Sequence, residues 1–168
     1  MNIEIILSII GGLYATFKWI YEYSENLKWN RNKFMLDEID KFRSIQTTKS
    51  VEKILDWNGI NVEVYGTEIY VNDEILFEAL QTHDVKQKFS KDEVLLRNLF
   101  DEYFDNLTKL IYMCETKMIS SNNFKLFMSY WLDILSSKNK NKPKKVHDQI
   151  LRYLEYYRFF TLKNYLIK

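Results

Sequence analysis

The sequence contains little cysteine, proline, glycine or histidine. Its 168 residues include one cysteine, one proline, four glycines and two histidines. A lone cysteine, Cys114, excludes a disulfide within the chain and is typical of a reducing compartment. The scarcity of proline and glycine favours helices, because tight turns depend on these residues. His83 and His147 have no second histidine or cysteine at a metal-ligand spacing, so we expect no metal site and no cofactor.

Strong charge of one sign is also missing. The 24 basic and 23 acidic residues give a net charge of +1, which does not favour binding to nucleic acid. Cys114 falls on the apolar face of a predicted helix, which is typical of a buried structural thiol. The arginine-then-histidine pattern of HEPN ribonucleases is absent, so a degenerate HEPN-like, nucleic-acid-associated domain is only a third hypothesis. We therefore expect the protein not to be an enzyme.

The longest apolar run lies at the N-terminus. No charged residue occurs from Ile5 to Phe17, and the run extends to Tyr21 if the stem of Lys18 lies along it. About 19 residues of helix span roughly 28 Å, close to the ~30 Å hydrocarbon core of a bilayer. No signal-peptidase site follows the run. The sequence thus predicts an uncleaved transmembrane anchor over residues 1–24.

Charge asymmetry predicts how this anchor is oriented. Before the apolar run the only charged side chain is Glu4, whereas basic residues follow closely: Lys18, Lys28, Arg31, Lys33, Lys41 and Arg43. By the positive-inside rule, the N-terminus lies outside a bacterial inner membrane and the body lies in the cytoplasm.

Small and polar residues share one face of the predicted anchor. They recur at steps of three and four, with one further glycine beside them: Glu4, Ser8, Gly11, Gly12, Ala15, Lys18 and Glu22. In lipid, small residues allow close helix packing and polar residues turn toward protein or water. This stripe predicts a homo-oligomer, and a more specific form of this prediction is an oligomer that encloses a water-lined pore. A lone anchor and a soluble core or interface helix are the open alternatives.

The remainder of the chain is predicted to be mainly α, a helical bundle with one small hairpin. A juxtamembrane helix over 25–46 is followed by a cytosolic domain over 47–168. Thr47-Thr48 is expected to separate that helix from a short one over 50–57. Residues 62–71 alternate on either side of a glycine, which predicts a β-hairpin.

Two helix starts are visible in the second half of the chain. Asn72 is a typical N-cap for a helix that ends near Gln81. Ser90 and Glu93 form a capping box that opens a long helix ending near Met118. Apolar spacing then predicts helices over 124–135 and 144–167, joined by a polar linker.

Two groups of charged residues are candidate sites. The first, Arg97, Asp101 and Asp105, has a spacing of four, which suits a metal or acid–base pair but more often a structural ion-pair ladder. The second is a lysine cluster that could contact the phosphates of lipid or RNA, or be a solvated loop: Lys138, Lys140, Lys142, Lys144 and Lys145. We interpret the first group as a structural ladder.

Short motifs between residues 54 and 132 carry a resemblance. They are Ile54-Leu55-Asp56-Trp57, Leu76, Ala79-Leu80, Phe89-Ser90, Glu93, Arg97, Phe100-Asp101, Phe104-Asp105, Leu107 and Tyr130-Trp131-Leu132. This part of the chain resembles a family of uncharacterised bacterial single-pass membrane proteins that pair an N-terminal anchor with a helical domain of unknown function. The resemblance implies the anchored helical architecture and no activity.

The functional hypothesis combines these observations. We expect a membrane-anchored, self-associating, non-enzymatic effector or accessory of a bacterial stress or antiphage defence system, with pore formation as its sharper form. Its partners would be the lipid bilayer and further copies of itself. The alternative is a monomeric or dimeric tethered adaptor for a cytosolic protein.

Overall fold

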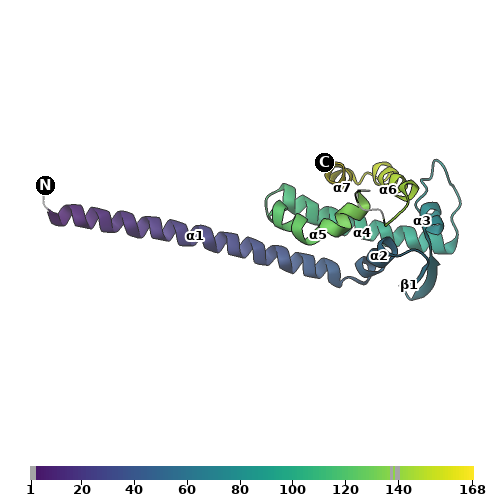
Figure 1. Cartoon of the computed structure of the whole chain (residues 1–168), viewed down its shortest axis with the longest axis horizontal. Helices are drawn as coiled ribbons and strands as arrows, with labels where there is room; N and C mark the ends of the chain where they lie inside the picture. The colour runs from purple at the N-terminus through teal and green to yellow at the C-terminus, as the bar shows by residue number, and fades with distance from the viewer. Residues whose placement is uncertain (1–2, 137, 139–140) are drawn as a thin grey trace.

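The computed structural model describes residues 3–136, 138 and 141–168. Within these ranges it contains seven helices and one two-stranded hairpin, in the following order: α1 (Ile3–Ser44), α2 (Gln46–Asp56), β1 (Ile60–Val64), β2 (Thr67–Val71), α3 (Asp73–Ala79), α4 (Lys91–Glu115), α5 (Ser121–Leu135), α6 (Lys144–Tyr156) and α7 (Phe160–Leu166). The predicted mainly α fold with one hairpin is confirmed. In Figure 1, α1 projects far beyond a body formed by the other elements.

Helix α1 is one continuous helix of 42 residues. The predicted anchor and juxtamembrane segments therefore form a single element. Met35, Ile39 and Phe42, spaced at four and three residues, are buried against the body. Every side chain described between Ile3 and Arg31 is exposed. About 25 residues, from Ile3 to Leu27, or roughly 37 Å of helix, thus extend beyond the body (Figure 1).

The predicted transmembrane helix is not supported. Among the described residues, no helix combines the length and the apolar character needed to cross a bilayer. Gly11, Thr16 and Lys18 lower the mean hydropathy of the apolar run. The side chains at positions 4–6 and 9 of that run lie outside the part that the structure describes.

The break between α1 and α2 differs from the predicted one. Ile45, with φ −64° and ψ 130°, ends the first helix, whereas Thr47 and Thr48 lie inside α2. Both threonines are buried, and the hydroxyl of Thr47 donates to a carboxylate oxygen of Glu102 on α4 at 2.8 Å. Packing against α4 therefore outweighs the weak helix propensity of threonine.

The predicted hairpin is confirmed. Strands β1 and β2 are antiparallel, with Val62 opposite Ile69. Tyr65 and Gly66 form the two-residue turn, and both have positive φ, as a type I′ turn requires. One face of the hairpin packs on α2 and α4 and buries its alternate residues: Val62, Val64, Ile69 and Val71.

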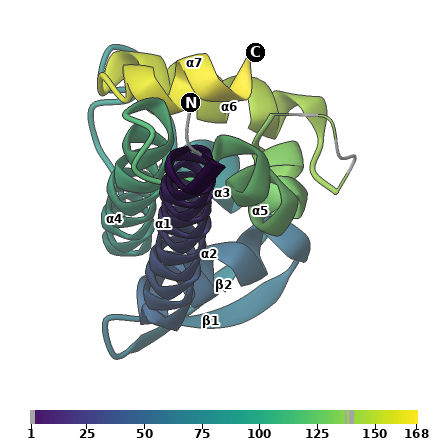
Figure 2. The same ribbon diagram turned by 90° about the vertical axis from the view of Figure 1, so that its left-hand side faces the viewer.

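Helix α4 lies at the centre of the body. It contacts α1, α2, α3, α5, α7 and β1, and Phe100, Tyr103 and Phe104 are fully buried along it. The capping box of Ser90 and Glu93 forms as predicted. Figure 2 looks along α1 and shows it between α4 and α5, with α6 and α7 on one side of the body and the hairpin on the other.

The predicted final helix is divided into α6 and α7. Helix α6 ends in a Schellman motif, in which the N–H groups of Arg158 and Phe159 donate to Glu155 and Leu154 at 3.2 and 2.8 Å. Arg158 takes the left-handed conformation, with φ 65°, that glycine usually supplies there. The break lets the ring of Phe159 pack edge-on against Phe104. An apolar stripe cannot reveal it, because no glycine or proline marks the position.

Arg97 connects α4 with the end of α3. Its Nη1 donates to the carbonyl oxygens of Ala79 at 2.8 Å and Gln81 at 2.6 Å, and its Nη2 donates to the hydroxyl of Tyr157. The Nε2 of Gln149 donates to the carbonyl of the intervening residue, Leu80, at 2.7 Å. The C-terminus of a helix leaves its last carbonyls without backbone partners. Arg97 and Gln149 therefore complete the end of α3.

Replacing Arg97 by methionine would leave the carbonyls of Ala79 and Gln81 buried without donors. We expect the free energy of unfolding, measured by urea denaturation, to fall by about 3 kcal/mol. The control is Arg152→Met, which removes a half-exposed ion pair with Asp84 and should cost less than about 1 kcal/mol. Equal losses in the two variants would show that the buried guanidinium has no special role.

Candidate functional site

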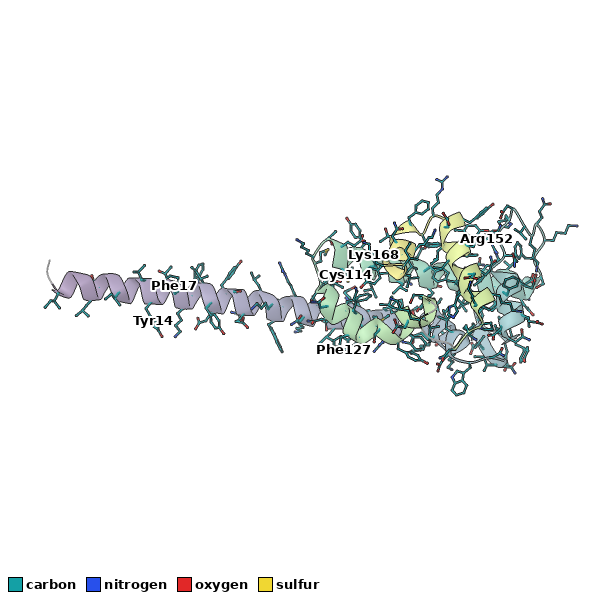
Figure 3. The ribbon with its side chains drawn as sticks, turned by 45° about the horizontal axis from the view of Figure 1, so that its top comes forward. Tyr14, Phe17, Cys114, Phe127, Arg152 and Lys168 are labelled. Carbon is teal, nitrogen blue, oxygen red and sulfur yellow. The ribbon has the colours of Figure 1, made fainter. Side chains whose placement is uncertain are left out.

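The projecting part of α1 exposes large apolar side chains along its length. They are Ile3, Leu7, Ile10, Leu13, Tyr14, Phe17, Trp19, Ile20, Tyr21, Tyr23 and Leu27. Phe17 is 69% exposed and Trp19 is 65% exposed, and Figure 3 shows Tyr14 and Phe17 extending from the helix without a neighbouring element. Water-exposed apolar surface of this extent marks a contact site for another molecule.

The predicted small-polar stripe lies along one side of this helix. The ammonium of Lys18 is 3.8 Å from a carboxylate oxygen of Glu22, which confirms that these two residues share a face. The preceding stripe positions follow at helical steps on the same side: Ser8, Gly11 and Ala15. The side chain of Glu4 lies outside the described residues.

The stripe offers room for close packing. A Cβ atom built at Gly11 or Gly12 would have no other group within 4 Å. The hydroxyl of Thr16 folds back onto the carbonyl of Gly12 at 2.9 Å and so satisfies its own donor within the helix. A second helix could therefore approach the backbone here without displacing any part of this chain.

Aromatic and basic side chains follow each other where the apolar run ends. Trp19 and Tyr23 stack with their ring centroids 5.7 Å apart, and Tyr21 and Trp29 are also exposed. Tryptophan and tyrosine prefer the boundary between hydrocarbon and water, and lysine and arginine prefer the phosphates beyond it. Along α1, the exposed apolar residues are thus followed by a segment that contains both aromatic and basic residues.

A cavity of about 470 Å³ opens where α1 meets the body. Its lining comes from α1 and from the turn between α4 and α5: Lys28, Arg31, Asn32, Cys114, Lys117, Ile119, Ser120, Ser121 and Asn123. The side-chain amide of Asn123 donates to that of Asn32 at 2.8 Å and joins the two walls. Three of the lining residues are cationic and none is acidic.

Cys114 lies at this cavity but is not a reactive thiol. It is buried on α4, as the sequence predicts, and burial raises the pKa of its thiol to about 11. A thiol with such a pKa stays protonated at neutral pH, and only the thiolate is a strong nucleophile.

The predicted ion-pair ladder on α4 does not form among the described residues. Arg97 donates to the end of α3 and stacks 4.2 Å from the centre of the Phe89 ring. Asp101 accepts a hydrogen bond from the hydroxyl of Tyr153 at 2.7 Å, and burial raises the pKa of its carboxyl group. Asp105 has no cation within ion-pair distance in the described part of the chain, which also contains no cluster of three metal-ligating side chains. The guanidinium of Arg97 bonds to the end of α3 and not to Asp101, because the carbonyls there need donors.

The lysine cluster is largely used within the fold. Lys142 is buried and bonds to a carboxylate of α3 at 2.7 Å and to the carbonyl that follows α2 at 2.6 Å. Lys144 and Lys145 lie 2.5 and 3.7 Å from carboxylates of α6 and α3. Lys138 is exposed, and Lys140 lies outside the described residues. The structure therefore gives these lysines no common phosphate site.

Sequence reasoning missed two features of the region around α1. It did not associate Lys117 with Arg31, because no local pattern connects positions so far apart. It also missed Glu52 on α2. Burial raises the pKa of its carboxyl group to about 7, and the positive charge of Arg43 on α1 acts in the opposite direction. Neither Oε1 of Glu52 nor the hydroxyl of Tyr103 on α4 has a hydrogen-bond partner among the described atoms.

No known protein family, curated protein sequence or solved structure matches this chain. The resemblance carried by residues 54–132 stays a prediction.

Glu52 should make stability depend on pH. Its pKa rises from 4.5 to about 7 on folding, so the folded protein binds more protons between these values and loses stability as the pH increases. We expect Glu52→Gln to be less destabilised than the wild type on going from pH 5 to pH 8 in urea denaturation. Parallel pH dependences in the two proteins would contradict this assignment.

Proposed function

We propose that this protein is a membrane-anchored, self-associating helical protein without catalytic activity, whose body acts as an interaction surface at the cytoplasmic face of a bacterial inner membrane. The observation that carries the proposal is the exposed apolar surface of α1 between Ile3 and Leu27. In this proposal, that segment embeds in a lipid bilayer and the buried residues from Met35 onward fix it to the body.

Energetics favour the removal of this segment from water. Removing one large apolar side chain from water contributes about 1.5–3 kcal/mol, so some ten such chains contribute on the order of 20 kcal/mol. The order of apolar, aromatic and basic residues along α1 agrees with insertion from the N-terminal end. The body then stands at the phosphate layer, on the basic side.

Self-association is the second part of the proposal. The open face at Gly11 and Gly12 and the Lys18–Glu22 pair fit a contact between copies of α1. We further propose that clustered anchors perturb the inner membrane in bacterial stress or antiphage defence. The support for that setting is analogy with short anchored helical effectors.

A tethered adaptor is the second candidate function. The body exposes Trp57 and Leu126, which are 63% and 74% accessible, and such side chains suit a contact with a cytosolic protein. An adaptor of this kind needs the anchor but not the contact between anchors.

Membrane insertion is tested with charged substitutions on α1. We expect the full-length double variant Ile10→Lys, Phe17→Glu to lose flotation with phosphatidylcholine vesicles by about tenfold or more, since each charge costs about 2.5–3.5 kcal/mol in hydrocarbon. The control is Val85→Lys with Leu126→Glu, which introduces the same two charges at residues of the body that are 55% and 74% exposed. Flotation that survives in the double variant would exclude lipid insertion of α1.

Self-association is tested by enlarging the stripe. Gly11→Leu with Ala15→Leu should leave vesicle binding intact and convert the detergent-solubilised oligomer into monomers in native mass spectrometry, because the larger side chains keep two backbones apart. The monomer fold has room for leucine at position 11. Gly11→Ala with Ala15→Ser is the control that keeps both positions small. An oligomer unchanged by the leucines would favour the simple tether.

A further inference from the structure

The cavity at the base of α1 is lined by three cationic residues and by no acidic residue. Arg31 on α1 and Lys117 in the α4–α5 turn have no ion pair with a described residue, and neither has an acidic neighbour in the cavity lining. Lys28 pairs with Glu25 of its own helix at 2.7 Å, on the exposed surface. A cavity lined by cations without carboxylates suits a negatively charged ligand.

The start of α5 adds donors to the same cavity. Ser120 caps this helix of 15 residues by accepting a hydrogen bond from the N–H of Asn123 at 3.4 Å. The other N–H groups of a first helical turn have no backbone acceptor, and the helix dipole makes this end positive. Ser120 and Ser121 also bring hydroxyl groups into the lining. Cations and neutral donors thus converge from two separate segments.

We propose that this cavity is a phosphate-binding site, in which Arg31, Lys117 and Lys28 surround the phosphate and the first turn of α5 donates to its oxygens. A phosphate group offers several acceptor oxygens around one centre, which suits donors arriving from different directions. The guanidinium of Arg31 can bind two of these oxygens at once. A cavity of about 470 Å³ exceeds the size of one phosphate and leaves room for the group esterified to it.

The proposed membrane function, on which this step rests, favours a phospholipid headgroup as the source of the phosphate. Lys28 lies about 8 Å beyond Tyr23 along α1 and directly before the exposed Trp29, within reach of a headgroup layer roughly 5–8 Å thick. Cys114, which also lines the cavity, lies at the end of the body from which α1 projects (Figure 3). The site therefore faces the side on which a membrane would lie.

The test uses the full-length chain and two double variants with the same loss of charge. Arg31→Gln with Lys117→Gln removes the two unpaired cations of the cavity. Lys88→Gln with Lys91→Gln removes two exposed lysines near the start of α4, away from the cavity. One arm compares flotation with phosphatidylcholine vesicles and with vesicles that also contain phosphatidylglycerol. The other arm measures thermal shifts with inorganic phosphate and glycerol phosphate in detergent, at constant ionic strength.

We expect the wild type and the control to prefer phosphatidylglycerol vesicles and to be stabilised by soluble phosphate. The cavity variant should lose the thermal shift and about tenfold or more of the lipid preference, as expected for two charges at a membrane surface, while still binding phosphatidylcholine vesicles. A cavity variant that behaves like the control in both arms overturns the site. Loss of the phosphate shift with an unchanged lipid preference assigns the site to free phosphate and overturns the headgroup as its source.

Failure of the membrane proposal would be seen separately, because the wild type would then not bind phosphatidylcholine vesicles. The thermal-shift arm does not depend on membrane binding.

The variant Lys117→Gly distinguishes loss of the site from loss of the fold. Lys117 has a left-handed backbone, with φ 59°, which glycine adopts more easily. We expect this variant to melt at the same or a higher temperature than the wild type and still to lose phosphate stabilisation. A full phosphate shift in Lys117→Gly would exclude the lysine from the site.

Discussion

The carbonyl groups at the end of α3 must find donors inside the body, and the guanidinium of Arg97 provides them. An arginine can be buried only when its N–H groups are satisfied, and here two carbonyls and the hydroxyl of Tyr157 do so. The same hydrogen bonds place α3 against α4 and bring the end of α6 over both. Because α4 also packs against α1, α2, α5, α7 and β1, the arrangement of the body depends on this one helix.

Helix α1 is bound to that body only by its last third. Met35, Ile39 and Phe42 bury their side chains, and the guanidinium of Arg43 donates to the carbonyl of Phe127 on α5 at 2.7 Å. The N-terminal two-thirds make no comparable contact in the described residues and expose large apolar side chains from Ile3 to Trp29. One part of α1 is therefore packed and the other is exposed, and this division is the basis of the membrane proposal.

Charged residues that look available in the sequence are mostly engaged in the structure. Lys142 is buried against Asp73, and Arg97 completes α3 instead of pairing with Asp101. Arg31 and Lys117, in contrast, have no ion pair with a described residue and line one cavity. A count of lysines along the chain points to the wrong segment, since the number of charges in a segment does not show which of them already have partners.

The features that could be predicted from the sequence rest on interactions between residues close together in the chain. The capping box at Ser90, the cap at Asn72 and the turn at Gly66 act over two to five residues, and all three form as expected. Three features became visible only in the folded protein: the start of α2 before Thr47, the break at Arg158, and the cavity lined by both Arg31 and Lys117. The first depends on the hydrogen bond from Thr47 to Glu102 on α4, and the second on the packing of Phe159 against Phe104. The third depends on the α4–α5 turn lying beside α1. Such contacts join positions distant in the chain, and propensity and periodicity carry no information about which distant segments will pack together.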